Sequence, residues 1–229
     1  MKAQDFEKTW LSRFSARLER AAGEEILRGV MEGSEDLHDG VERNRVIEWS
    51  ARAMESLDRL VGEEKRIEVM TGCACQYPKA ELQEIRKKYE ETKDIDLILE
   101  MLQHKFVSFL RNRLNLNGNI VEDIVQKGWG LAGRRDGSKI IATKIPKSGH
   151  ILDYFSETDR VKKRAIYCHC PRIRDALKMG AEISSTYCYC GAGYYKGIWE
   201  EILQKPVRVQ LLTSVLKGDD VCSIAVHLP

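Results

Sequence analysis

The spacing of apolar residues changes at Gly128, and this change most constrains how the chain can fold. Before Gly128, apolar residues recur every three to four positions, which places them on one face of a helix. After it, short runs rich in β-branched residues alternate with shorter helical segments. The sequence therefore predicts a helical first half and a mixed second half.

Glycine and proline positions set the bounds of the expected helices in the first half. These helices span residues 6–30, 41–61, a short segment that ends near Gly72, 79–91, 95–114 and 120–126. Gly62 ends the second of them, and Pro78 suits the start of the fourth, because the first turn of a helix needs no backbone N–H there. We expect residues 1–127 to form a helical region.

The second half predicts an antiparallel sheet flanked by helices. Strands are expected at 139–145, 151–155, 164–167, 207–213 and 221–227, with helices at 171–179 and 194–203. Turn residues at 134–137 and 217–220 indicate hairpins, and such short connections favour antiparallel over parallel strands. The fold class is therefore α+β, with 128–229 as an α/β region that binds ligand and metal. The two regions are either separate or one continuous domain.

Composition and charge exclude several classes of protein. The chain has 37 basic and 35 acidic residues spread along it, without the basic excess of a nucleic-acid binder. No apolar run approaches the roughly 18 residues needed to cross a bilayer, and residues 1–7 lack the apolar stretch of a signal peptide. We expect a cytoplasmic protein without nucleic-acid or membrane partners, and a homodimer remains an alternative to a monomer.

Seven cysteines form the candidate site, and six of them occur in Cys-x-Cys pairs. The pairs are Cys73 with Cys75, Cys168 with Cys170, and Cys188 with Cys190, and Cys222 stands alone on the last expected strand. In extended backbone, residues two apart point to the same side, so each pair can present two sulfurs together. Under reducing conditions such cysteines favour metal or thiol chemistry over disulfides. The alternative is that they fill the core as small apolar residues, above all Cys222.

Each pair also lies just before an expected helix, whose positive end would stabilise thiolates. Zinc and iron–sulfur clusters both accept thiolate ligands, and the spacing does not decide between them, because the two-residue gaps of zinc ribbons are absent. Zinc is the leading expectation, and an iron–sulfur cluster is the alternative. The expected metal ligands are Cys168, Cys170, Cys188 and Cys190, then Cys222, then Cys73 and Cys75, with His169 in reserve. His169 is placed last because on a strand it would point to the opposite face. No catalytic residue is assigned.

Residues around the third pair predict a site for a small organic ligand. Tyr189 and Tyr194 would place phenol rings beside the cysteines. Gly191 and Gly193 would let the start of the next helix approach an anionic group. Close packing of that helix is the alternative interpretation of the two glycines.

Two motifs resemble known families. Residues 167–172 (YCHCPR) and 187–193 (YCYCGAG) resemble an uncharacterised prokaryotic family of similar length. Residues 217–222 (KGDDVC) are more distantly similar to vinyl-reductase-type small-molecule-binding domains and to aminothiazoline-carboxylate hydrolase-like proteins. The vinyl-reductase resemblance implies an α/β ligand-binding fold whose zinc is held by a cysteine before a helix and by a glutamate and two cysteines on the final hairpin. Cys188 or Cys190 and Cys222 match this pattern, whereas Leu211 and Ser214 stand where the other two ligands would lie.

Three hypotheses for function follow. The leading one is a metal–thiolate protein, with zinc, that binds a small organic ligand. The second is a zinc- or thiol-dependent hydrolase of a small cyclic C–N compound, in which bound water or a thiolate attacks the substrate. The third is an iron–sulfur redox protein.

Overall fold

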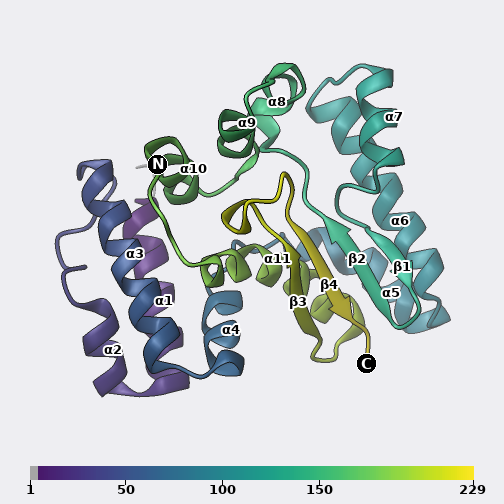
Figure 1. Ribbon diagram of the computed structural model, residues 1–229. Coiled ribbons are helices and arrows are strands. Elements are labelled where there is room, and N and C mark those ends of the chain that lie inside the picture. Colours follow the sequence, from purple (N-terminus) through teal and green to yellow (C-terminus); the bar gives the residue numbers. More distant parts are fainter. Residues whose placement is uncertain (1–4) are drawn as a thin grey trace.

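The computed structural model describes residues 5–229 and shows the α+β class that the sequence predicts (Figure 1). The helices are α1 (Phe6–Ala22), α2 (Glu24–Met31), α3 (Arg43–Leu60), α4 (Glu63–Gly72), α5 (Gln83–Thr92), α6 (Ile95–Ser108), α7 (Gly118–Gln126), α8 (Ile151–Ser156), α9 (Arg160–Tyr167), α10 (Pro171–Met179) and α11 (Tyr189–Leu203). The strands are β1 (Arg134–Asp136), β2 (Lys139–Thr143), β3 (Arg208–Thr213) and β4 (Ser223–His227).

The strands form an antiparallel sheet in the order β1-β2-β4-β3. The central strands β2 and β4 are far apart in sequence but pair directly, with Thr143 opposite Ser223. The two hydroxyl groups of this pair lie 2.8 Å apart. Because β2 ends where β4 begins, the residues just outside these ends, Lys144 and Cys222, are brought together.

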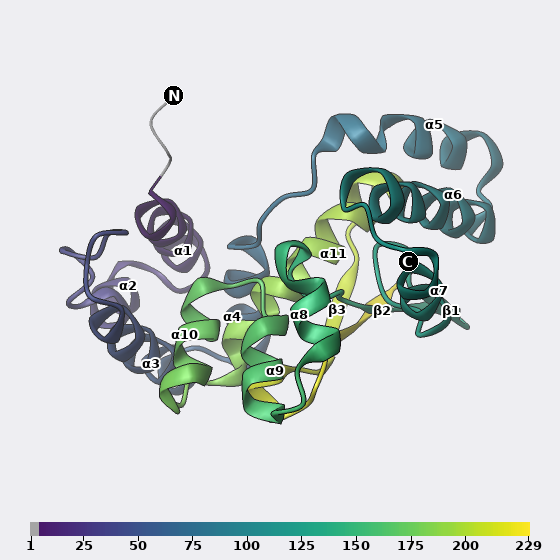
Figure 2. The same ribbon diagram turned by 90° about the horizontal axis from the view of Figure 1, so that it is seen from above.

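The helices lie in separate groups around the sheet (Figure 1). Helices α1–α3 lie on one side of the molecule and α5–α7 on the other, and the view from above shows the same separation (Figure 2). Helix α11 contacts α4 and α5 as well as β3 and β4, so it connects the groups. None of the helices between residues 5 and 229 is long and apolar enough to span a bilayer.

Two clusters of buried side chains hold these groups together. One contains the inner side chains of the sheet, such as Ile140 and Ile224, with residues of α5–α7 and α11, including Trp199. The other joins α1–α4 to α8–α10 around side chains such as Phe14 and Trp49. Each cluster thus combines residues from before and after position 127, and the division into regions 1–127 and 128–229 stays a prediction.

Two of the expected strands are wrong. Residues 151–155 lie in α8, and residues 164–167 lie in α9. Asp159 caps α9, because its carboxylate accepts a hydrogen bond of 2.8 Å from the backbone N–H of Lys162. Short apolar runs do not distinguish a buried strand from a helix, so this capping residue was the better signal.

Helix bounds also differ from the expected ones at four places. The segment 79–91 begins with a 3₁₀ helix, Lys79–Leu82, before α5. The segment 6–30 is two helices, because Gly23 adopts a φ of +84° that ends α1 before α2 begins. The segment 95–114 ends in a π-helical turn, Phe109–Arg113. Helix α11 begins at Tyr189 and not at 194, which places Cys190 in its first turn.

Candidate functional site

Six of the seven cysteines line one cavity of about 820 Å³. They are Cys75, Cys168, Cys170, Cys188, Cys190 and Cys222. Cys73 is the exception, since it is buried in the core and its thiol donates to the Val69 carbonyl at 3.2 Å. The structure therefore brings the C-terminal cysteines together and adds one member of the first pair.

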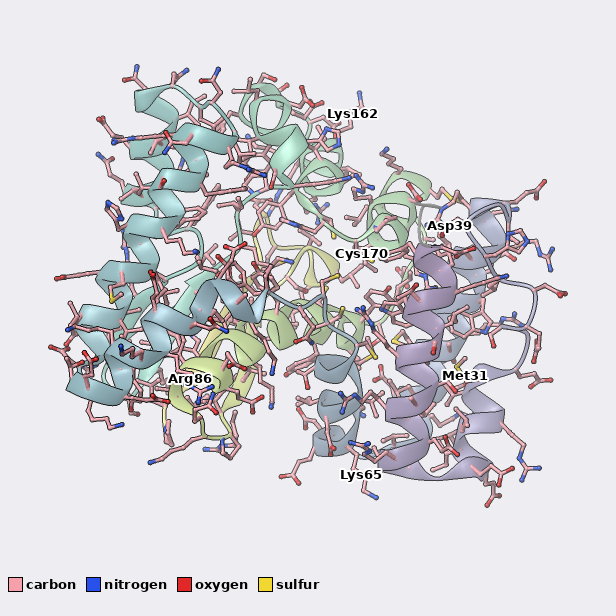
Figure 3. The ribbon with its side chains drawn as sticks, turned by 180° about the vertical axis from the view of Figure 1, so that it is seen from behind. Met31, Asp39, Lys65, Arg86, Lys162 and Cys170 are labelled. Atoms are coloured by element: carbon pink, nitrogen blue, oxygen red, sulfur yellow. The ribbon has the colours of Figure 1, made fainter. Side chains whose placement is uncertain are left out.

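Local structure determines how each pair reaches the cavity. Cys168 and Cys170 have extended backbone between α9 and α10, so both face the cavity as the alternation predicts. Cys170 is the N-cap of α10, and its position is labelled in Figure 3. For Cys188 and Cys190 the extended-backbone expectation is wrong, because Cys188 caps α11 and Cys190 lies within it.

A closed ring of three hydrogen bonds fixes Lys144 beside Cys222. The backbone N–H of Lys144 donates to the Cys222 carbonyl at 3.0 Å. The N–H of Cys222 donates to the Tyr167 hydroxyl at 2.9 Å, and this hydroxyl donates to the Lys144 carbonyl at 2.7 Å. Tyr167 is buried, so its hydroxyl sets the backbone of two residues that line the cavity.

We expect Tyr167→Phe to lower the free energy of unfolding by about 1–3 kcal/mol, because it leaves a buried N–H and a buried carbonyl without partners. Urea denaturation followed by circular dichroism measures this loss. Tyr89→Phe is the matched control, since no hydrogen bond of the Tyr89 hydroxyl occurs in the described part of the chain. An equal loss of stability in both variants would show that the three hydrogen bonds around Tyr167 do not stabilise the protein.

The loop between β3 and β4 directs hydrogen-bond donors at two of the sulfurs. The Ser214 hydroxyl and the Leu216 N–H lower the pKa of Cys188, and the Val215 N–H lowers that of Cys222, although burial has the larger and opposite effect on both thiols. Val215 and Leu216 begin a short 3₁₀ helix, Val215–Lys217, whose first N–H groups have no acceptor within the helix. Such donors stabilise sulfur in its anionic or metal-bound form.

Four of the cavity thiols, those of Cys168, Cys188, Cys190 and Cys222, nevertheless have raised pKa values. Burial, and to a smaller extent neighbouring thiolates, raise the pKa of both Cys188 and Cys190 to about 12. Burial likewise raises the pKa of Cys168 and of Cys222. The positive charge of Lys144 acts in the opposite direction on all four thiols. A bound metal cation would favour the thiolate form of these four cysteines.

His169 lines the same cavity as the cysteines on either side of it, although strand alternation predicted the opposite face. Its Nε2 lies 2.9 Å from the Ile145 carbonyl, so Nε2 carries the proton and Nδ1 has its lone pair free. Burial, and to a smaller extent the positive charge of Lys144, lower the pKa of His169 to about 4. The imidazole is thus neutral at pH 7, which is the form that binds metals.

A second part of the cavity wall combines sulfur with aromatic rings. The Cys170 sulfur lies 3.3 Å from the Tyr187 hydroxyl, and the Tyr187 ring stacks on Trp10 with centroids 5.3 Å apart. Trp10 is only 5% exposed, and its Nε1 has no hydrogen-bond partner. Although burial raises the pKa of Cys190, this indole N–H lowers it, so it faces the Cys190 sulfur.

The four residues expected to bind a ligand have different positions. Gly191 and Tyr194 line the cavity, whereas Gly193 and Tyr189 are not part of its lining. A Cβ on Gly193 would lie 2.1 Å from the Thr71 carbonyl oxygen, so this glycine serves the packing of α11 against α4. The contact at Gly193 is thus the close packing that was the alternative interpretation, and its role in ligand binding stays a prediction.

Sequence reasoning missed two residues of the site, Lys144 and Trp10. Trp10 belongs to the apolar stripe of α1 and gave no separate signal. Lys144 follows a β-branched run, and only its pairing with the strand after Cys222 reveals its place. Ser214, which the vinyl-reductase pattern marks as a departure, is near enough to Cys188 for its hydroxyl to lower the pKa of that thiol.

The donor set fits a borderline-soft metal ion in its chemistry, because thiolate and imidazole are the ligands that zinc prefers. Within residues 5–229, however, no three side chains of His, Cys, Asp or Glu are already arranged around a common point that could hold a metal ion. The sulfurs line the wall of the cavity instead. Metal binding here requires cysteine side chains to rotate inward.

The C-terminal part of the chain is similar to a family of unknown function. Residues 147–228 match the model described as "Family of unknown function (DUF6144)". This segment is less than half of the chain, and it contains both cysteine motifs and five of the cysteines that line the cavity. No curated protein and no solved structure shows a significant match. The similarity supports the expectation of an uncharacterised family, and the vinyl-reductase and hydrolase-like resemblances stay predictions.

Proposed function

We propose that this chain is a metal–thiolate protein that holds zinc with its cavity cysteines and binds a small organic ligand beside the metal. The observation that carries the proposal is that cysteines from four separate segments line one cavity. Core packing accounts for a cysteine such as Cys73, which is enclosed by apolar side chains. It does not account for six thiols around an open space.

Cys188, Cys222 and Cys168 are the first ligands that we propose. The loop donors from Ser214–Leu216 favour anionic sulfur at the first two. Cys168 is close enough to both for their charges to raise its pKa, in addition to the larger effects of burial and Cys170. Cys170, Cys190 and Cys75 are the next candidates, and His169 can supply nitrogen. Zinc at this place would hold the thiolates and polarise a ligand atom.

The cavity offers little support for a hydrolase that uses a carboxylate as its general base. Glu81 is the one carboxylate that lines the cavity within residues 5–229. It accepts a hydrogen bond of 2.9 Å from Tyr77 and lies 3.3 Å from Lys105, and the hydrogen bonds from these two side chains lower the pKa of Glu81. A carboxylate held in this way is a poor general base.

Metal analysis of protein purified without oxygen tests the proposal. We expect about one zinc per chain, by analogy with mononuclear thiolate sites, and its loss in the double variant Cys188→Ser/Cys222→Ser. Cys73→Ser is the matched control and should keep the metal, since Cys73 lies outside the cavity. Circular dichroism would show that all three proteins are folded.

Two results would count against the proposal. Absence of metal from the wild-type protein, both as purified and after addition of Zn²⁺ to the reduced protein, would overturn it. Iron and inorganic sulfide in place of zinc would support the iron–sulfur alternative.

A further inference from the structure

Lys144 is a cation without a counter-ion in the cavity wall. Within residues 5–229, no Asp or Glu lies within ion-pair distance of its Nζ, whereas Lys105 is paired with Glu81. The backbone of Lys144 is held by the ring with Cys222 and Tyr167, so the fold fixes where this side chain begins. An unpaired ammonium that is held partly buried favours binding of an anion.

The ammonium also lies against the start of α11. A Cβ on Gly191, the third residue of this helix, would be 3.5 Å from Lys144 Nζ. The N-terminal end of a helix carries partial positive charge, so a cation there is unfavourable unless an anion accompanies it. The unpartnered Trp10 N–H faces Cys190 in the same first turn. Lys144 and Trp10 thus belong to different elements and line the same cavity.

The net charge of the residues that line the cavity also favours binding of an anion. Its charged side chains are Glu81, Lys105, Arg113 and Lys144. Glu81 and Lys105 pair with each other, which leaves Arg113 and Lys144 as the uncompensated charges. The neutral His169 adds none. The lining is thus positive overall.

The rest of the wall is aromatic. Tyr77 and Tyr194 meet edge to face with centroids 6.1 Å apart, and Phe106 and Phe109 lie on the same cavity. A volume of about 820 Å³ is within the range of pockets for organic molecules. Such a wall suits a flat apolar body, and the donors near α11 suit an acidic group attached to it.

We propose that the cavity binds an organic anion with an aromatic or apolar body, whose carboxylate pairs with Lys144 and accepts the N–H of Trp10. This inference rests on the proposed function, because it specifies the chemistry of the organic ligand named there.

A matched pair of fluorescent probes tests the inference. 2-Naphthoate and 2-naphthamide have nearly the same shape and differ in charge. Fluorescence titration of the wild-type protein should show at least about tenfold tighter binding of the naphthoate, which corresponds to one charge-assisted contact. Lys144→Met should abolish this preference while leaving binding of the amide unchanged, and Lys144→Arg should keep most of it. Lys162→Met, on the surface of α9 (Figure 3), is the control and should behave as wild type.

Equal affinity of the wild-type protein for the two probes, or no binding of either, would overturn the inference without any variant. A preference that survives in folded Lys144→Met would overturn it as well. Metal analysis of the same samples separates this outcome from the proposed function. Metal without naphthoate selectivity refutes only the inference, and selectivity without metal refutes only the metal–thiolate proposal.

Discussion

Gly193→Ala is expected to destabilise the protein by about 3 kcal/mol, at the upper end of the usual cost of overpacking. A methyl group at this position would lie 2.1 Å from the carbonyl oxygen of Thr71 and 2.7 Å from its carbonyl carbon. These are backbone atoms of α4, so rotation of a side chain cannot relieve the clash. The two helices would have to separate, and Cys75, which follows α4, would shift with them.

Gly197→Ala on the same helix is the control for this prediction. Its Cβ would meet only the end of the Gln76 side chain, at 3.6 Å. Alanine is favoured over glycine inside a helix by up to about 1 kcal/mol, so this variant should be as stable as wild type or more stable. Urea denaturation of both variants gives the comparison. A Gly193→Ala protein as stable as wild type would show that α4 and α11 are not in such close contact.

The sequence correctly predicted the helices and strands that are marked by nearby residues, such as a proline or glycine at a helix end or a run of β-branched residues. Helix α10 has the expected bounds, because Pro171 and Gly180 mark its two ends. Strands β2, β3 and β4 lie where β-branched runs occur. Helices α8 and α9 were missed because each is short and each contains an apolar run that fits a strand equally well. Their helical state follows from local capping and from packing against other helices.

The candidate site was predictable only in part, for a similar reason. The cysteine spacing indicated convergence, and the structure places five C-terminal cysteines and Cys75 on one cavity. Spacing could not show that Cys73 turns into the core, because this depends on where α4 ends. Nor could it identify Lys144 or Trp10, whose roles depend on contacts between elements far apart in the chain.

A buried ion pair connects α1 to the cysteine segment. The Glu7 carboxylate accepts hydrogen bonds of 2.6 Å from Arg172 Nε and from Arg43 Nη1. Glu7 and Arg172 are both fully buried, and the Arg172 guanidinium lies 4.0 Å from the centroid of the Trp10 ring. Arg172 follows Cys170 by two residues. The ion pair between Glu7 and Arg172 therefore links α1 to the segment that carries Cys170.

Glu7→Gln should therefore lower the free energy of unfolding by about 3–5 kcal/mol, because it leaves the charge of Arg172 buried without compensation. Glu55→Gln, an exposed position on α3, is the matched control and should change stability by less than about 0.5 kcal/mol. Urea denaturation of both variants measures these differences.

A double variant separates loss of the ion pair from loss of packing. Glu7→Leu/Arg172→Met replaces both charges with apolar side chains, so neither charge is left alone in the core. Replacing a whole buried pair often costs little, whereas removing one partner costs much. We therefore expect the double variant to be clearly more stable than Glu7→Leu alone, with a positive coupling between the two sites. Simple additivity of the two single losses would mean that Glu7 and Arg172 stabilise the protein independently, and that the α1 connection depends on the aromatic contacts of Trp10 instead.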